Sequence, residues 1–174
     1  MPQTFQEGRV EFSFPDTWLV LRPEKASYYK RHFQNFAGGC KEMDFILFDP
    51  TANVLWLLEV KDYTTNPRKK TQCVLEEVVE KSRDSLALLY AGAICDNASA
   101  PSVGDFAKSS WVPSKVRVVL HLDQPSKPSR LYPGAKLAAD ATQALRAKVK
   151  AVDSHAFVSS CSGKMEGWTA TWNP

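Results

Sequence analysis

The sequence predicts a single α/β domain in which helices pack on a mixed β-sheet. Two apolar runs, residues 42–49 and 53–62, flank the turn formers DPTAN and predict a β-hairpin of central strands. Amphipathic helical patterns alternate with strand patterns around this hairpin, as in α/β proteins. The 174 residues, 44% of them apolar, are enough for one ordinary core. We therefore expect one domain over residues 1–174, with its core at about 10–124.

The segments before the hairpin predict a strand and a helix. Short apolar runs within residues 10–21 suit a core strand. Residues 24–36 suit a helix, because Pro23 favours a first turn and Gly38 and Gly39 favour a stop. Aromatic residues of this helix recur at spacings of three and four, which predicts a core-facing stripe made of Tyr28, Tyr29, His32, Phe33 and Phe36.

The segments after the hairpin continue the alternation. Residues 72–92 predict a long amphipathic helix that ends at Gly92, and residues 93–113 predict a surface loop. SKVRVVLHLD predicts a β-branched strand. The region at about 135–172 predicts an alanine-rich helix followed by a closing pair of strands, HAFVSS and WTATW.

Charge and cysteine content restrict the class of protein. The formal net charge of +3 permits a polyanionic partner but does not require one. The first residues lack a signal-peptide pattern and no run of about 18 apolar residues occurs, so we expect a cytoplasmic protein without a membrane segment. The four cysteines lack C-x-x-C pairs or a neighbouring histidine, which favours free or buried thiols over structural zinc. His32 and His121 are interpreted as core or boundary residues.

Charged residues interrupt the most apolar segment of the chain. Side chains alternate along a strand, so Glu59 and Lys61 share one face with Leu57. Counting outward from the turn places Asp44 opposite residue 58 or 59. Burial of an isolated charge costs several kcal/mol, so these three charged residues must pair with each other or bind a metal.

This arrangement resembles the PD-(D/E)XK nuclease superfamily, which contains restriction endonucleases and Holliday-junction resolvases. The family pattern corresponds to MDFILF and LLEVKDY, with fourteen residues between Asp44 and Glu59. The proline of the first family motif is absent, since Met43 precedes Asp44. The resemblance covers about half of the chain. It implies a restriction endonuclease-like three-layer sandwich, with a mixed central sheet flanked by helices and a core order of helix, three strands, helix, strand.

The resemblance also implies hydrolysis of DNA phosphodiester bonds with Mg²⁺, for which Mn²⁺ can substitute, by an endonuclease rather than an exonuclease. Asp44, Glu59 and the backbone carbonyl of Val60 would hold the metal, because Mg²⁺ prefers oxygen ligands. Lys61 would orient or help to deprotonate the attacking water and stabilise the transition state. The pathway stays open between repair, recombination, restriction and phage defence.

Further residues are candidates for the same site. Glu24 is a candidate additional acid, and its alternative role is to complement a helix dipole. Gln72, at the start of the following helix, is a candidate site-lining residue. Lys81 is a candidate phosphate contact, with a solvated helix face as its alternative. A basic loop is a second candidate for contacts with the nucleic-acid backbone, or merely solubilising, and consists of Arg68, Lys69 and Lys70.

Two alternatives to a nuclease remain open at the level of sequence. One is a catalytically inactive, nuclease-like module that binds nucleic acid or protein. The other is an α/β interaction domain in which Glu59 and Lys61 form a structural ion pair. For the nuclease, DNA is the expected partner, and cleavage of both strands by a one-site subunit would call for a symmetric homodimer.

Overall fold

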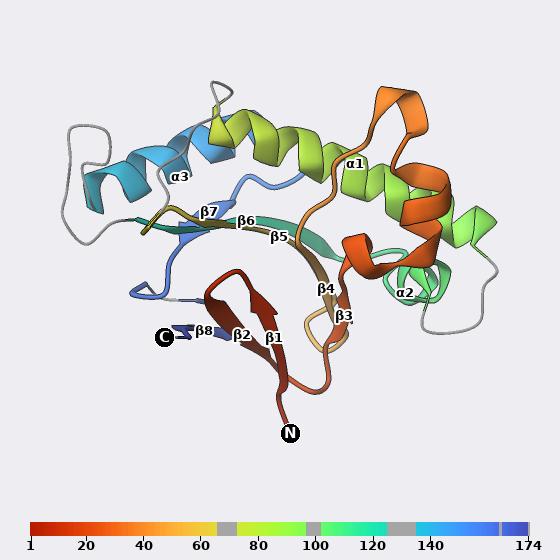
Figure 1. Ribbon diagram of the computed structural model, residues 1–174, viewed down its shortest axis with the longest axis horizontal. Helices are drawn as coiled ribbons and strands as arrows, with labels where there is room; N and C mark the ends of the chain where they lie inside the picture. Colours follow the sequence, from red (N-terminus) through yellow and green to blue (C-terminus); the bar gives the residue numbers. More distant parts are fainter. Residues whose placement is uncertain (66–72, 97–101, 125–134, 164, 174) are drawn as a thin grey trace.

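The protein combines two β-sheets with helices (Figure 1). The structure is a computed structural model and describes residues 1–65, 73–96, 102–124, 135–163 and 165–173. One sheet has five strands and is mixed, and the other has three strands. The predicted α/β class with a mixed central sheet is confirmed.

The five-stranded sheet is the centre of the molecule. Its order is β3-β4-β5-β6-β7. Strand β4 runs antiparallel to both β3 and β5, whereas β6 runs parallel to both β5 and β7. The predicted hairpin of central strands is confirmed as β4 and β5. The strands are β3 (Leu19–Leu21), β4 (Phe45–Asp49), β5 (Val54–Asp62), β6 (Lys115–Asp123) and β7 (Phe157–Ser159).

The three-stranded sheet joins the two ends of the described chain. It is antiparallel throughout, with β2 (Val10–Phe14) between β1 (Gln3–Glu7) and β8 (Thr169–Trp172). The prediction of a closing strand pair was therefore wrong. Strand β7 pairs with β6 in the central sheet, and β8 pairs with β2 in the smaller one. Local patterns indicate strands but do not say which strands pair.

In the described residues, the long helices cover one face of the central sheet. Helices α1 (Val74–Cys95) and α3 (Ala135–Val149) lie on that face, and the smaller sheet lies on the opposite face (Figure 1). The layers are thus helices, sheet and second sheet, which differs from the expected sheet flanked by helices. The order β3, β4, β5, α1, β6 still reproduces three strands, a helix and a strand.

The helix predicted over residues 24–36 was wrong as a single element. The chain between β3 and β4 instead forms two short 3-10 turns, Pro23–Lys25 and Phe36–Gly38, on either side of a π-helical turn at Tyr29–Phe33. Only Tyr29 and Phe33 of the predicted aromatic stripe are buried. Tyr28 is partly buried, whereas His32 and Phe36 are exposed.

Helix α1 continues past Gly92, contrary to the prediction. A Cβ atom at Gly92 would lie 2.5 Å from Cγ1 of Val103, so the missing side chain permits close contact with another helix. That helix, α2 (Val103–Ser109), lies within the segment predicted as a loop. The side chain of Ser102 caps it by accepting a hydrogen bond of 3.0 Å from the Asp105 backbone N–H.

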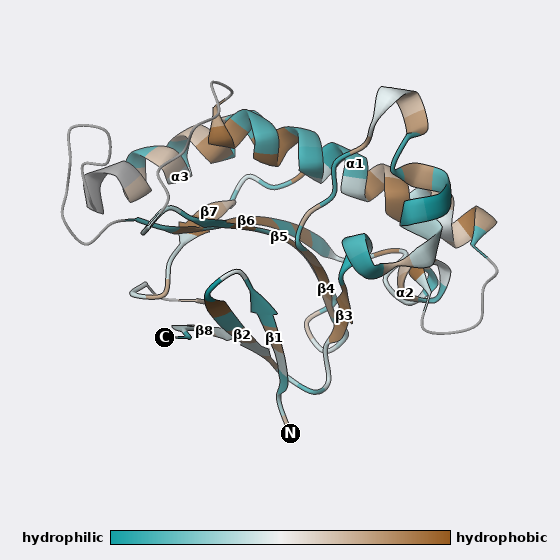
Figure 2. Ribbon diagram, in the orientation of Figure 1, coloured by the Kyte–Doolittle hydropathy of each residue, from teal (hydrophilic) through white to brown (hydrophobic). Residues whose placement is uncertain are grey.

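The two faces of β5 belong to different apolar cores. Leu55 and Leu57 pack in the core beneath α1, whereas Trp56 and Leu58 pack in the core between the two sheets. The predicted alternation of faces is thus confirmed. Figure 2 shows apolar residues along the strands of the central sheet and on part of α1. Glu59 and Lys61 continue the face of β5 that is directed toward α1.

Candidate active site

Asp44 lies at the point where β4 begins, and its side chain extends the strand pairing. The register places Phe45 opposite Leu58, so Asp44 follows opposite Glu59, as expected. Oδ2 of Asp44 accepts a hydrogen bond of 2.7 Å from the backbone N–H of Val60. The Asp44 carboxylate thereby takes the place of a backbone acceptor. This hydrogen bond fixes the orientation of the carboxylate where β4 begins.

Glu59 is a fully buried carboxylate with two ammonium partners. Nζ of Lys61 lies 2.5 Å from Oε1 of Glu59, and Nζ of Lys81 lies 2.7 Å from Oε1 and 2.8 Å from Oε2. The ammonium of Lys81 is also 3.7 Å from Oδ1 of Asp44. The two predicted carboxylates therefore converge on one positive group, and this group comes from α1.

Helix α1 contributes a second charged residue, Glu77. Its side chain is buried, and Oε1 lies 3.1 Å from Nζ of Lys61. Glu77 and Lys81 are four residues apart and therefore lie on the same side of the helix. Lys61 is thus held between Glu59 of its own strand and Glu77 of the helix.

Glu7, at the end of β1 in the smaller sheet, lies near the same cluster of charged residues. Burial raises the pKa of Glu7, and the nearby Asp44 raises it further, although Arg22 opposes this effect. The Arg22 guanidinium forms ion pairs with Glu7 and with Glu24, and it also lies 5.1 Å from the ring centroid of Phe45. Arg22 therefore connects the end of β3 to the rim of the acidic cluster.

Burial and like charge shape the electrostatics of the site. Burial raises the pKa of Glu59 to about 7, with Asp44 adding to the effect, while Lys81 and Lys61 oppose it. Burial alone would lower the pKa of Lys61, but the carboxylates of Glu59 and Glu77 outweigh it and raise this pKa above its ordinary value. Lys61 is therefore a stable ammonium at neutral pH, whereas Glu59 is close to its titration midpoint.

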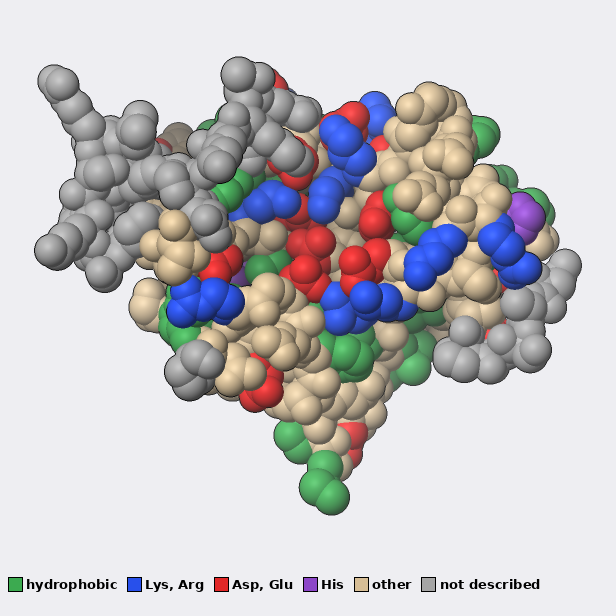
Figure 3. All heavy atoms as spheres, viewed as in Figure 1, with side chains coloured by type: hydrophobic (Ala, Val, Ile, Leu, Met, Phe, Trp, Pro, Cys, Tyr) green, Lys and Arg blue, Asp and Glu red, His purple; other side chains and the backbone are tan. Residues whose placement is uncertain are grey.

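The charged residues reach the surface on one face of the protein. Figure 3 shows Asp and Glu side chains gathered near the centre of this face, with Lys and Arg side chains around them. Asp44, Lys61 and Lys81 are 22%, 18% and 14% exposed at their side chains. A ligand can therefore reach these three groups while Glu59 stays beneath them.

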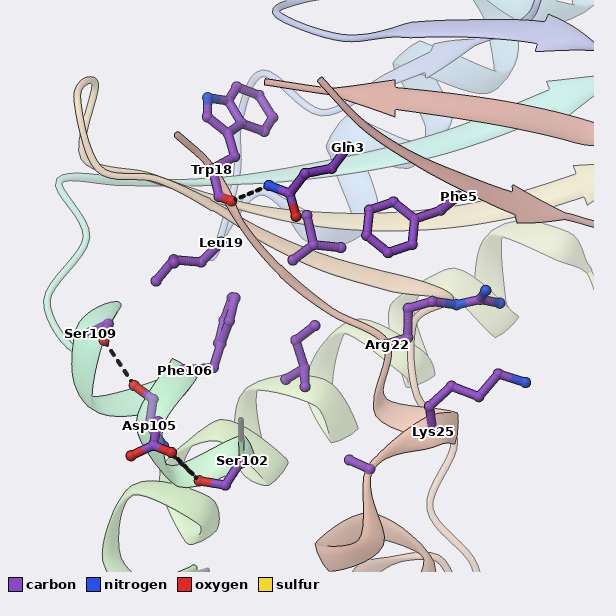
Figure 4. A pocket seen from close by; sticks show the side chains of 13 residues that line it. Gln3, Phe5, Trp18, Leu19, Arg22, Lys25, Ser102, Asp105, Phe106 and Ser109 are labelled. Carbon is purple, nitrogen blue, oxygen red and sulfur yellow. Dashed lines mark hydrogen bonds between the residues drawn. The ribbon is translucent and has the colours of Figure 1, made fainter. Parts of the chain in front are cut away.

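An open groove of about 620 Å³ lies beside Arg22. Figure 4 shows Phe106 and Leu19 in its apolar part, and Arg22 and Lys25 at one end with their nitrogen atoms directed away from Phe106. Strand β3, at the edge of the central sheet, forms one wall, and α2 forms another. The groove thus joins an apolar wall to a basic end.

The structure brings together the three predicted catalytic residues, Asp44, Glu59 and Lys61, together with Lys81. The alternative of a solvated helix face for Lys81 is excluded, because its ammonium lies among the carboxylates. Glu24 is 40% exposed at its side chain and pairs with Arg22 and Lys25, so it lies at the rim. The remaining candidates lie outside the described residues and are Arg68, Lys69, Lys70 and Gln72.

Sequence reasoning missed Glu77 and Glu7. A signal for Glu77 was present, because this acid sits between the apolar residues Leu75 and Val78 of a helix that follows the Glu-x-Lys strand. Four residues separate it from Lys81, and this spacing could have indicated a charged pair on the buried side. Glu7 carries no such signal, since its place depends on how the second sheet packs.

The donor set suits a hard divalent cation. Asp44 and Glu59 offer carboxylate oxygens, which Mg²⁺ prefers, and both already face the single positive charge of Lys81. The N–H and C=O of one strand residue point to the same neighbouring strand. The Val60 carbonyl is therefore directed, like its N–H, toward the side of Asp44. These three groups would hold the ion, and Lys81 would have to yield its position.

Comparisons with known proteins give one similarity of low identity. The chain is 26% identical to a cysteine–tRNA ligase of Neisseria meningitidis serogroup A over 163 residues, which cover 76% of this chain and 23% of the ligase. The chain thus spans about a quarter of the length of that protein. No family model and no solved structure matches. None of the helices in the described part of the chain has the length and apolar character needed to cross a membrane.

Proposed function

We propose that the protein is a metal-dependent nuclease with a restriction endonuclease-like core, which hydrolyses phosphodiester bonds of DNA. The observation that carries this proposal is the convergence of Asp44, Glu59, Lys61 and Lys81 where β4 begins and β5 ends. Two carboxylates and two ammonium groups at one partly exposed position suit the binding of a divalent cation and a phosphate together.

Each side chain has a defined part in this proposal. Asp44 and Glu59 hold the cation, with the Val60 carbonyl as a further ligand. Bound Mg²⁺ would supply an activated water and neutralise negative charge on the phosphate. Lys61 Nζ, held by Glu59 and Glu77, presents a positive charge to the phosphate oxygens. Its raised pKa favours this electrostatic part over removal of a proton from water.

Lys81 has a second part that depends on the state of the site. Its ammonium lies beside Asp44 and Glu59 and offsets part of their negative charge. A bound cation would replace Lys81 as the partner of these carboxylates, and the charge of Lys81 would then be available to a phosphate oxygen. The buried acids are thereby kept paired in both states, which avoids the cost of an isolated buried charge.

The surroundings of the site are consistent with a nucleic-acid substrate. Arg22 and Lys25 line one end of the groove, where these basic side chains can contact backbone phosphates. The ligase to which the chain is similar is named for its action on tRNA, so tRNA belongs among the substrates tested. One site per chain would nick a single strand, and a symmetric homodimer would be needed to cut both strands.

The experiment is a cleavage assay with supercoiled plasmid, single-stranded DNA and tRNA, each with Mg²⁺ or Mn²⁺. We expect nicked plasmid from the wild type and a loss of at least 100-fold in rate for Glu59→Gln and Lys61→Met. Glu76→Gln and Lys41→Met are matched controls, since both residues are exposed on or near α1 and lie outside the cluster. Their rates should equal that of the wild type.

Equal folding of all variants is verified by circular dichroism before the assay. No cleavage of any substrate with either metal would overturn the nuclease proposal. Retained binding of nucleic acid in that case would favour the inactive, nuclease-like binding module. Cleavage by the wild type that persists in both site variants would place the activity elsewhere or in a contaminant.

A further inference from the structure

A second polar cluster lies on the opposite face of the central sheet. His121 and Asp123 lie near the end of β6, and Cys161 follows β7. On β6 the alternate residues Leu120 and Leu122 belong to the core beneath α1, so His121 and Asp123 point toward the second sheet. The cluster is therefore separated from the candidate active site by the sheet itself.

Three potential metal ligands converge in this cluster. Nε2 of His121 lies 2.8 Å from Oδ2 of Asp123 and 3.6 Å from Sγ of Cys161. One ligand atom from each of the three residues lies within 4.8 Å of the other two. His121 is fully buried, Asp123 is 4% exposed and Cys161 is half-buried. A histidine, a carboxylate and a thiol thus share one enclosed position.

Neighbouring groups fix the orientation of each ligand. Nδ1 of His121 lies 3.1 Å from Oγ of Ser159, and Phe12 of β2 packs edge-on against the imidazole at a centroid distance of 5.0 Å. The backbone N–H of Cys161 donates a hydrogen bond of 3.0 Å to Oδ1 of Asp123. Outer contacts of this kind hold metal ligands in place and set which imidazole nitrogen is free.

We propose that His121, Asp123 and Cys161 bind a transition-metal ion, with Zn²⁺ as the preferred ion. Imidazole and thiolate ligands select zinc over magnesium. A tetrahedral zinc ion with ordinary bond lengths would separate Sγ and Nε2 by about 3.5 Å, and they lie 3.6 Å apart in the structure. The pair of His121 and Asp123 would have to open by roughly 0.5 Å to admit the ion at the same bond lengths.

Binding requires a defined movement of protons. The Cys161 thiol releases its proton to solvent as the S–metal bond forms. The imidazole would give up the proton on Nε2, which lies 2.8 Å from Oδ2 of Asp123, and would carry a proton on Nδ1 instead, where it donates to Oγ of Ser159. Asp123 binds as a carboxylate through Oδ2, since Oδ1 already accepts from the Cys161 backbone. A water molecule would complete the coordination left open by the three protein ligands.

The metal would link two parts of the fold. It would join the end of β6 to the segment that leads from β7 into β8. Because β8 pairs with β2, the metal would anchor the chain close to its crossing from the central sheet to the smaller one. C-x-x-C pairs and cysteines with a neighbouring histidine, which predict zinc from sequence, are absent here, and for this reason the sequence favoured free or buried thiols.

The test is a titration of the chelator-treated full chain with Co²⁺ and Zn²⁺. We expect one equivalent of Co²⁺ to produce a thiolate-to-cobalt charge-transfer band. Zn²⁺ should displace the cobalt ion and abolish the band, and it should raise Tm. Cys161→Ser should lose the band and the Tm shift. Cys40→Ser is the matched control, because Cys40 is also half-buried but contacts Phe36 and is remote in sequence from the proposed site. This variant should retain both the cobalt band and the Tm shift.

Two further variants keep the outcome clear. Glu59→Gln should retain the cobalt band, which separates this site from the candidate active site and from the fate of the nuclease proposal. Asp123→Asn should weaken binding at least tenfold while the protein stays folded by circular dichroism. A Co²⁺ spectrum without a thiolate band, or a band unchanged in Cys161→Ser, would overturn the proposal and leave a buried hydrogen-bonded His–Asp pair.

Discussion

Asp44 accepts a hydrogen bond of 2.7 Å from the backbone N–H of Val60 and so continues the pairing of β4 with β5 beyond the first residue of β4. The same carboxylate is proposed to bind the cation. The Asp44 side chain therefore both extends the strand pairing and belongs to the candidate active site. Variants at this position can separate these two roles.

Replacement of Asp44 should separate stability from activity. Asp44→Asn keeps an acceptor for the Val60 N–H, so we expect nearly unchanged stability and a large loss of cleavage. Asp44→Ala leaves that N–H without its acceptor and should lower the free energy of unfolding by about 1–3 kcal/mol. Urea unfolding of both variants measures this difference. Equal stability of the two would contradict the bridging part of Asp44.

The titration of Glu59 should appear in the pH dependence of stability. Its pKa is raised to about 7 in the folded protein from an ordinary value of 4.5, so the folded state binds more protons between these values. Its contribution is complete below pH 4.5 and is lost as the pH rises through 7, by about 3 kcal/mol. Urea unfolding across this range should show a fall in stability that Glu59→Gln abolishes and Glu76→Gln retains.

Lys81 should compete with a divalent cation. Its ammonium lies near both carboxylates that are proposed to bind the ion. In Lys81→Met these acids lose one positive partner, so we expect a larger rise of Tm with Mg²⁺ than in the wild type, alongside slower cleavage. Thermal melting with and without Mg²⁺ measures this shift. Lys41→Met, on the exposed pair with Glu80, should behave as the wild type.

The contact between α1 and α2 should tolerate no side chain at Gly104. A Cβ atom there would lie 2.2 Å from the backbone oxygen of Asp96, whereas at Gly92 it would meet the side chain of Val103. A backbone atom yields less readily than a side chain. We therefore expect Gly104→Ala to destabilise the protein more than Gly92→Ala, by about 1–3 kcal/mol against the wild type. Chemical denaturation of the two variants measures their free energies of unfolding. A greater loss of stability in Gly92→Ala than in Gly104→Ala would contradict this prediction.

The sequence predicted the parts of the fold that depend on local pattern. Alternation along β5 identified the face shared by Glu59 and Lys61, and turn residues identified the hairpin. The pairing of β8 with β2 could not be predicted, because both strands have ordinary patterns and lie at opposite ends of the chain. The cluster of His121 with Cys161 was missed for the same reason, since β6 and β7 meet only through the fold.

Charged residues were harder to interpret than apolar ones. Lys81 follows a helical pattern that suits a solvated face, and only the position of α1 over β5 turns it toward Glu59. Arg22 likewise forms an ion pair with Glu7, which belongs to the smaller sheet. The identity of a charged side chain indicates chemistry, but its partner is chosen by tertiary packing.

The pairing of β2 with β8 has a consequence for how the molecule folds. Val10 lies opposite Trp172, so roughly 160 residues separate the two partners along the chain. Contacts this remote lower the rate of folding, because a long loop must close before they form. The hairpin of β4 and β5 is local and can form early, carrying the catalytic candidates with it. The smaller sheet would then be completed late. Pairing of β8 would bring Ala170 of that strand, and Trp168 just before it, against the apolar core between the sheets.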